Sequence, residues 1–273
     1  MRSFNRWALT GLFCAVFAIG FVAFVGAQTS ATPAPSTTPA SGAAQAVPAS
    51  GGGEKTVEEA YLQESLETMI ITEQAQSDSK DMKLVALDYI KQALDAGRKN
   101  DEIRKSLEYL ALESTTMVAR SGGVGQPLNN FPDVRREACR DLGKFQTVEA
   151  KDALVKVVLS DNEPMVLSAA IRSLGEIGMN DNDEVTTVIS YIINRYDILM
   201  PDNSLAFDSL VALEQIADKN GGIKDPGAIR AVIRIASGNY IKPVRDRANY
   251  LLGKLRQYNA AASASTSSGG ANQ

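Results

Sequence analysis

Acidic residues that lie close together are the first candidates for chemistry in this 273-residue chain. Asp181, Asp183 and Glu184 occur in the run MNDNDE, and carboxylate oxygens are ligands that calcium prefers. The run lacks the full spacing and the glycine of a calcium-binding loop. We therefore predict that these acids form a solvated turn that caps a helix, and that they hold no metal ion.

A glycine-rich run at residues 120–131, RSGGVGQPLNNF, is the second candidate. Glycine-rich loops cradle phosphates when they follow an apolar strand and end in Gly-Lys-Ser or Gly-Lys-Thr. This run has no such ending, and no apolar strand precedes it. We therefore predict a surface loop at residues 118–131.

Histidine is absent from the chain, and the two cysteines are Cys14 and Cys139. Without histidine there is no His-based acid–base catalysis, no Ser-His-Asp or Cys-His nucleophile, and no His-ligated metal. Cys139 lies beside an apolar helix stripe and is predicted to be a buried hydrophobic residue. Carboxylate catalysis stays open, but the chain is predicted not to be an enzyme and to carry no cofactor.

A repeated pattern of apolar and small residues dominates the second half of the chain. The pattern V-x-x-x-A-x-x-x-L-G-x-apolar begins at Val134, Val166, Leu205 and Val244, in steps of 32, 39 and 39 residues. Positions 0, 4, 8 and 11 of each copy fall on one stripe of an α-helix, and only Ser209 among them is polar. Steps of this size are typical of a helical solenoid, in which each unit packs against its neighbours.

These copies resemble HEAT repeats, particularly the short bacterial kind of phycobilisome-lyase-like proteins. The resemblance rests on D-V-R-x-x-A-x-x-L-G and L-x-D-x-x-x-x-V-x-x-A-A-x-x-L-G. The matching residues are Asp133, Val134, Arg135, Ala138, Leu142, Gly143, Leu159, Asp161, Val166, Ala169, Ala170, Leu174, Gly175, Val244, Arg245, Ala248, Leu252 and Gly253. Ser209, Glu214 and Leu167 depart from the pattern. The resemblance implies an all-α fold, an α-solenoid of antiparallel helix pairs at residues 132–258, and says almost nothing about function.

Further helices are expected around and before the repeats. Partner helices are predicted at residues 147–159, at 184–196 and from Asp225 onward, where capping residues or proline begin them. Residues 54–117 are predicted to form three helices and a degenerate repeat. Their expected buried positions are Met82, Ala86, Ile90, Ala93, Ile103, Leu107, Leu110 and Ala111.

The N-terminus predicts export. Arg2 and Arg6 precede an apolar stretch at residues 7–25, and Val25-Gly26-Ala27 resembles a signal-peptidase site. Residues 1–27 are therefore a signal peptide, or a membrane anchor if the signal is retained, because the apolar stretch nearly suffices to span a bilayer. The rest of the protein is expected in the periplasm or cell envelope.

Two segments are predicted to be disordered. Residues 28–53 carry no charge and consist almost entirely of Ala, Ser, Thr, Pro and Gly, which is typical of a flexible linker. Residues 259–273 have a similar composition and are predicted to form a disordered tail.

Charge is distributed unevenly along the helical part. Residues 54–117 hold fourteen acids and eight bases, whereas residues 219–258 hold nine bases and two acids. This polarity could belong to solvated terminal helices, or it could orient a partner or favour head-to-tail association.

The second helices of such units usually line the concave surface. Lys151, Lys156, Tyr191, Arg195, Arg230 and Arg234 occupy expected outward positions there. Tyr and Arg are common interface anchors, so we predict that Tyr191, Arg195, Arg230 and Arg234 bind a partner.

The leading hypothesis is a non-catalytic exported HEAT-repeat scaffold that binds another protein in the cell envelope, in assembly or stabilisation of a complex. Two alternatives stay open. Similar repeats occur in bilin lyases, so the chain could be a lyase-type or pigment-handling enzyme. It could also bind an anionic envelope polymer through its basic C-terminal end. Its net charge of −4 argues against a nucleic-acid partner.

Overall fold

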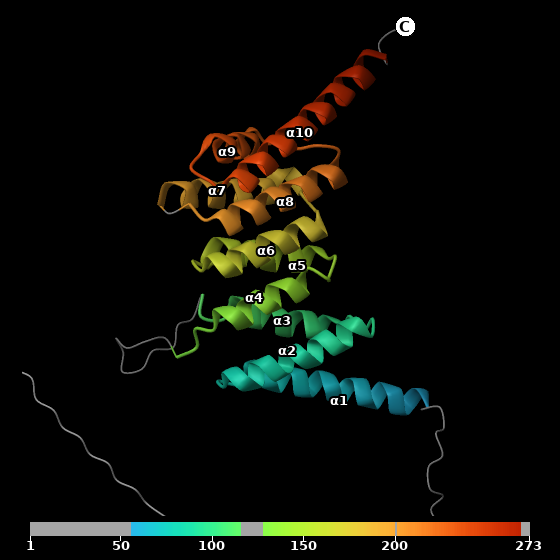
Figure 1. Ribbon diagram of the computed structural model, residues 1–273. Helices are drawn as coiled ribbons and strands as arrows, with labels where there is room; N and C mark the ends of the chain where they lie inside the picture. Colours follow the sequence, from blue (N-terminus) through green and yellow to red (C-terminus); the bar gives the residue numbers. More distant parts are fainter. Residues whose placement is uncertain (1–55, 116–127, 200, 269–273) are drawn as a thin grey trace, which may run out of the picture. The chain divides into compact units, whose positions relative to one another are not determined.

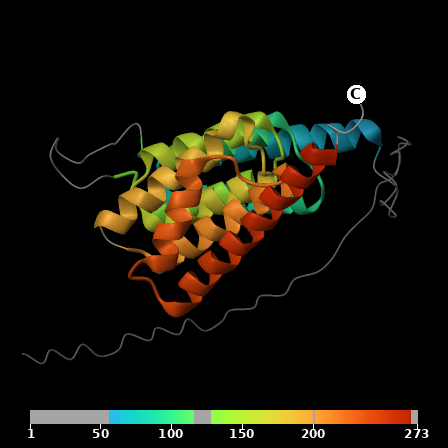
Figure 2. The ribbon, with the colours of Figure 1, turned by 90° about the horizontal axis from the view of Figure 1, so that it is seen from above.

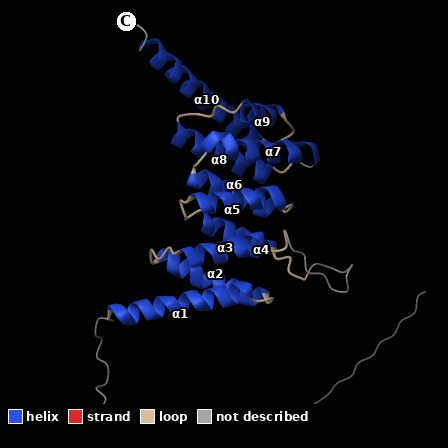
Figure 3. Ribbon diagram, turned by 180° about the vertical axis from the view of Figure 1, so that it is seen from behind, coloured by secondary structure: helices blue, strands red, loops and turns tan. Residues whose placement is uncertain are grey.

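The computed structural model describes residues 56–115, 128–199 and 201–268. These residues all belong to one compact unit, Glu54–Gln273, and within them every regular element is helical (Figures 1 and 3). The elements are α1 (Val57–Gln76), α2 (Lys80–Asp95), α3 (Asp101–Leu112), α4 (Pro132–Leu142), α5 (Val148–Ser160), α6 (Pro164–Ile177), the 3-10 helix η1 (Asp181–Asp183), α7 (Glu184–Leu199), α8 (Asn203–Asn220), α9 (Pro226–Ser237) and α10 (Lys242–Ser268).

The helices stack in two layers. The odd-numbered helices α1, α3, α5, α7 and α9 pack in order on one another, and so do the even-numbered helices α2, α4, α6, α8 and α10 (Figures 1 and 2). Each odd helix also packs against the even helix that follows it, so the unit consists of five successive helical hairpins. The predicted all-α solenoid of paired helices is confirmed, and the N-terminal helices continue its regular order.

Local sequence explains where the helices begin. Thr56 and Glu59 form a capping box, because the Thr56 hydroxyl accepts from the Glu59 amide and the Glu59 carboxylate accepts from the Thr56 amide. The Thr147 hydroxyl caps α5, and the Asp225 carboxylate accepts two amide hydrogen bonds at the start of α9. Pro132 stands in the first turn of α4, where its missing N–H costs nothing. The predicted helix starts are therefore confirmed at these sites.

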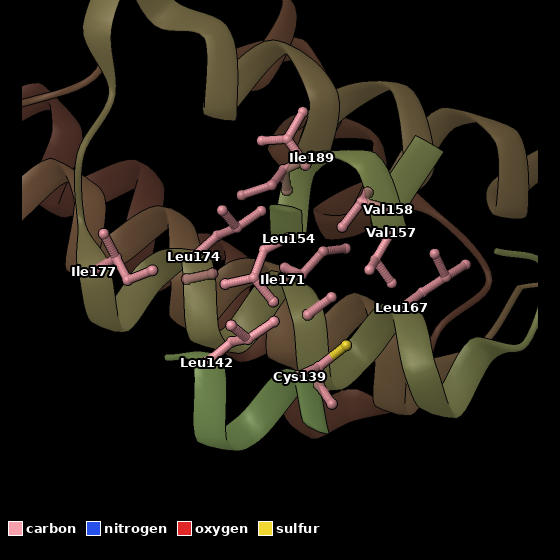
Figure 4. Close-up of a cluster of buried hydrophobic side chains, with 14 of the residues drawn as sticks. Cys139, Leu142, Leu154, Val157, Val158, Leu167, Ile171, Leu174, Ile177 and Ile189 are labelled. Atoms are coloured by element: carbon pink, nitrogen blue, oxygen red, sulfur yellow. The ribbon is translucent and has the colours of Figure 1, made fainter. Parts of the chain in front are cut away.

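The apolar stripes form one continuous core. Val134, Val166, Leu205 and Val244 are all buried, as are most of the later stripe positions. Figure 4 shows side chains from α4, α5, α6 and α7 meeting in the middle of the stack. Ser209 is buried too, and its hydroxyl donates to the Leu205 carbonyl oxygen at 2.7 Å, so the one polar stripe residue is satisfied.

Two repeat glycines mark close approaches between successive even helices. A Cβ added at Gly143 would lie 2.7 Å from Ser173 Oγ, and one at Gly175 would lie 2.6 Å from Ala212 Cα. Both distances are too short for an ordinary contact, so only glycine lets α4 approach α6, and α6 approach α8, this closely. Gly253 holds the same repeat position in α10, the last even helix, and a Cβ there would meet nothing within 4 Å.

A buried ion pair joins consecutive hairpins. Arg135 Nε in α4 donates to Asp161 Oδ2 at 2.6 Å, and both side chains are almost fully buried. Asp161 Oδ1 also accepts from the amides of Asn162 and Glu163, so the carboxylate fixes the turn between α5 and α6. Arg135 is the arginine of the D-V-R match, and Asp161 is the aspartate of the L-x-D match. These two parts of the repeat pattern therefore contact each other between consecutive units.

A second buried charge lies in the first two hairpins, at a position that the repeat pattern does not mark. Lys83 is fully buried in α2, and its Nζ donates to the Ala75 carbonyl oxygen at 3.0 Å and pairs with Glu113 at 2.9 Å. Met82, which was predicted to be buried, is instead 48% exposed. The prediction is wrong because α2 is the first even helix of the described residues, and no earlier described helix packs on that side.

Two helix ends differ from expectation. The helix predicted to reach residue 117 ends at Leu112, where Thr115 bonds back to the Leu112 carbonyl oxygen through both its amide and its hydroxyl. The predicted disordered tail at residues 259–273 is also wrong in part, since α10 continues to Ser268. Alanine has the highest helix propensity of any residue type. The run of alanines that opens this segment therefore outweighs the serines that follow it.

Several predictions lie outside the described residues. These are the signal or anchor at residues 1–27, the linker at 28–53, most of the loop at 118–131 and the last residues of the tail. No helix within the described part combines the length and apolarity that a membrane span requires.

Candidate protein-binding surface

The acidic run MNDNDE forms the turn that leads into α7. Asp181 and Asp183 belong to η1, and the Asn180 side chain accepts from the Thr186 amide at 3.1 Å and donates to Asp183 Oδ1 at 3.2 Å. Glu184 points to another helix, where its Oε2 accepts from Lys151 Nζ at 2.7 Å. The residues therefore join η1 to α7, and the described residues contain no group of acids, cysteines or histidines arranged to hold a metal ion.

Cys139 is fully buried in α4, between the first and second repeats. Burial raises the pKa of its thiol far above the ordinary range, with a smaller contribution from the negative charge of Asp161. A thiol that stays protonated and shielded from solvent is a packing residue, as the sequence predicts.

The exposed side chains of the odd helices form the surface that best fits a partner. We call it the odd-layer face and define it by the exposed residues Lys105, Tyr109, Lys156, Leu159, Tyr191, Ile198, Arg230 and Ile233. Helices α5 and α7 have odd neighbours on both sides and the even layer behind them, so their exposed side chains face outward. On α3, α5 and α9 the face has a basic residue three or four positions before a large apolar one, and on α7 Arg195 lies between Tyr191 and Ile198 in the sequence.

The four predicted partner-binding residues all lie on α7 or α9 of the odd layer. Tyr191 is 52% exposed, and Arg230 is exposed and makes no ion pair within the described part of the chain. Arg195 Nη2 donates to Asn162 Oδ1 at 2.6 Å, and Arg234 lies 3.8 Å from Asp197. Arg195 and Arg234 are thus held by neighbouring groups, whereas Tyr191 and Arg230 are free to contact a partner.

Lys151 was also predicted to point outward, and this is wrong. Its side chain is almost fully buried and pairs with both Glu184 and Asp152, at 2.7 and 2.9 Å. The hydrogen bond to Glu184 and then that to Asp152 raise the pKa of the ammonium group. The residue lies one turn before Val155, on a side of α5 that packs against α7, so helical periodicity alone could not place it outside.

The sequence analysis missed the exposed apolar residues of this face. Leu159, Ile198 and Ile233 are 54, 75 and 49% exposed. A signal existed, because Ile198 lies seven residues after Tyr191 and Ile233 lies three after Arg230, each on the polar side of its helix.

A shallow depression of about 680 Å³ lies on the opposite, even layer, across α4, α6 and α8. Its arginines are Arg136, Arg140 and Arg172. Arg136 and Arg140 share one carboxylate, Glu137, and Arg172 binds Asp208. The depression is shallow, and each of its arginines is therefore already in contact with an acidic side chain.

Comparison with known proteins supports the repeat assignment. Residues 128–194, from just before α4 into α7, match the family model described as HEAT repeats. A solved structure of the complex of CpcE and CpcF of phycocyanin lyase from Nostoc sp. PCC7120 resembles the chain with a TM-score of 0.46 and 17% sequence identity. That similarity covers 80% of this chain and 73% of the other. No curated protein matches the chain.

The described part of the chain is therefore an all-helical solenoid, and its residues 128–194 match the HEAT-repeat model. The resemblance seen in the sequence is confirmed for residues 128–194, and the same two-layer order extends beyond them in both directions.

Proposed function

We propose that this protein is a non-catalytic scaffold that binds another protein through its odd-layer face. The observation that carries the proposal is the row of half-exposed apolar side chains on successive odd helices, each close to a basic residue. Soluble proteins seldom leave several large apolar side chains exposed on one face unless a partner covers them. Tyr191 and Arg230 are of the residue types that most often supply binding energy.

The chemistry of the described residues supports binding over catalysis. The one described cysteine is buried, the arginines of the even-layer depression already contact carboxylates, and the chain has no histidine. Solenoids present long rigid surfaces, because each hairpin is fixed by its neighbours. A rigid face loses little conformational entropy when it binds, which favours a stable complex.

We place this scaffold in the cell envelope. The support is the sequence of residues 1–27, in which two arginines precede an apolar stretch and small residues follow it. Its role there would be assembly or stabilisation of an envelope complex, with basic residues of the odd-layer face meeting an acidic surface of the partner.

Site-specific photo-crosslinking in intact cells tests this proposal. A photoreactive phenylalanine analogue replaces Tyr191 on the odd layer or, as a matched control, Phe207, an exposed aromatic residue of α8 on the even layer. We expect a discrete protein adduct from position 191 and none from position 207. Equal adducts from both positions, or a protein adduct from neither, would contradict binding through the odd-layer face.

A further inference from the structure

The first hairpin leaves apolar surface uncovered at the N-terminal end of the stack. Helix α1 buries Ile71 and Ala75 against α2 and α3, whereas Leu62, Leu66 and Met69 on its opposite side are 61, 58 and 63% exposed. Terminal hairpins of a solenoid ordinarily carry a polar outer face, because nothing packs on them. This end therefore has the surface of an internal hairpin, although no described hairpin precedes it.

The even layer likewise has no described helix before α2. Met82 holds the repeat position at which Val134, Val166, Leu205 and Val244 are buried. Each of those four residues belongs to an even helix that follows another even helix, and α2 follows none. A depression of about 410 Å³ between α1 and α2, lined in part by Leu66, Ile70 and Tyr89, belongs to this same end.

No hairpin follows α10 within the described residues, and α10 keeps residues at the positions that contact a following hairpin elsewhere in the stack. Arg245 occupies the repeat position of Arg135, whose carboxylate partner, Asp161, comes from the next hairpin. Arg245 itself is exposed and pairs with no acid within the described residues. Gly253 occupies the position of Gly143 and Gly175, which touch the next even helix, and has an empty space instead.

The two ends also carry opposite charge. Helix α1 contains five glutamates and no lysine or arginine. On α10, Arg247 and Lys254 are bound to Glu214 of α8 and Lys242 is bound to Asp246, so Arg245 and Arg256 remain as its unpaired bases. Two α1 ends would repel each other, and so would two α10 ends, whereas unlike ends attract.

We propose that the α1–α2 end of one molecule binds the α10 end of a second copy, so that the hairpins continue from one molecule to the next. Glutamates of α1 meet Arg245 and Arg256, and the apolar stripe of α1 is covered. A head-to-tail contact of this kind uses different surfaces on the two partners, so it generates open chains unless the rotation closes a ring. It involves the ends of the stack and does not rest on the function proposed for the odd-layer face.

Sedimentation velocity of the purified full chain over a range of concentrations tests the proposal. One variant places lysines at two acidic positions of α1 (Glu58→Lys with Glu73→Lys), and a second reverses the charge of the two unpaired arginines of α10 (Arg245→Glu with Arg256→Glu). All four residues are exposed, and circular dichroism verifies that each variant is folded. A control variant, Lys156→Glu, changes an exposed charge in the middle of the stack.

We expect the wild type and the control to associate with rising concentration, less so at high salt. Each end variant alone needs at least a tenfold higher concentration to associate. An equimolar mixture of the two associates again, because the lysines of the first variant then meet the glutamates of the second. A monomeric wild type at every concentration would overturn the proposal. So would association that neither end variant weakens, or a mixture that fails to restore it.

Discussion

Gly175 and Ala212 bring two even helices together almost backbone to backbone, since a Cβ at Gly175 would lie 2.6 Å from the Ala212 Cα. Gly143 makes a second contact of this kind, with Ser173, at the same position of the preceding unit. These contacts set how closely one hairpin packs on the next, and therefore how rigidly the odd-layer face is held.

Substituting Gly175 tests this contact. In Gly175→Ala the new methyl group meets backbone atoms that cannot move aside easily, so we expect the free energy of unfolding to fall by about 1–3 kcal/mol. Gly253→Ala is the matched control, because the same repeat position is open there. Removing a helical glycine without a clash should raise stability by about 0.5–1 kcal/mol. Urea denaturation at low protein concentration measures both, and equal effects would contradict the packing role.

The Arg135–Asp161 pair gives a second prediction. Asp161→Ala leaves the Arg135 guanidinium buried without its counter-ion and frees two amides in the α5–α6 turn, so we expect a loss of about 3–5 kcal/mol. The double variant Arg135→Leu with Asp161→Ala should lose less than the sum of the two single variants, because no charge is then left unpaired. Denaturation of all four proteins in a double-mutant cycle gives the coupling free energy. Additive losses would show that the two side chains act independently.

Cys139 should be unreactive in the folded protein. In a Cys14→Ser background, we expect a thiol reagent to label Cys139 only after denaturation, because the side chain is fully buried. Rapid labelling of the native protein at neutral pH would contradict the packing of α4.

The raised pKa of Cys139 also predicts a pH dependence with a definite sign. The folded state keeps the thiol protonated, whereas the unfolded chain releases its proton near pH ~8.5. The contribution of this group to stability is therefore fully present below that pH and declines as the pH rises above it. In Cys139→Ala the free energy of unfolding should therefore fall less between pH 7 and pH 10 than in the wild type. An equal fall in both proteins would exclude the thiol as a cause of the pH dependence.

The charges of the odd-layer face give the next prediction. Charge reversal by Arg230→Glu with Arg234→Glu should abolish stoichiometric capture of the partner from envelope extracts, because both residues are basic and exposed. Arg172→Glu on the even layer is the control and should leave capture unchanged. If isolated cell wall retains the protein instead, with no protein partner and a steep dependence on salt, the basic residues bind a polymer.

Much of this architecture follows from the sequence because its determinants are local. Caps such as Thr147 and Asp225 satisfy amides within their own turn, and the stripe that begins at Val166 depends only on helical periodicity. Sequence therefore predicts the helices, their starts and the paired arrangement.

Features that depend on which neighbour is present could not be predicted in this way. Met82 is exposed and no described hairpin precedes its own, whereas Lys151 is buried and pairs with Glu184 of a later helix. Neither fact is encoded near the residue itself. The odd-layer face was found only in part for the same reason, since Ile198 fits an apolar position equally well inside or outside.

The most direct test of the account is the affinity of the crosslinked partner for the purified protein, measured by calorimetry with matched variants. Tyr191→Ala with Ile198→Ser truncates two exposed side chains of α7 on the odd-layer face, and Phe207→Ala truncates an exposed one on the even layer. The account predicts at least a tenfold weaker complex for the first variant, equivalent to about 1.4 kcal/mol, and no change for the second. Unchanged affinity in the first variant, or an equal loss in both, would contradict binding through the odd helices.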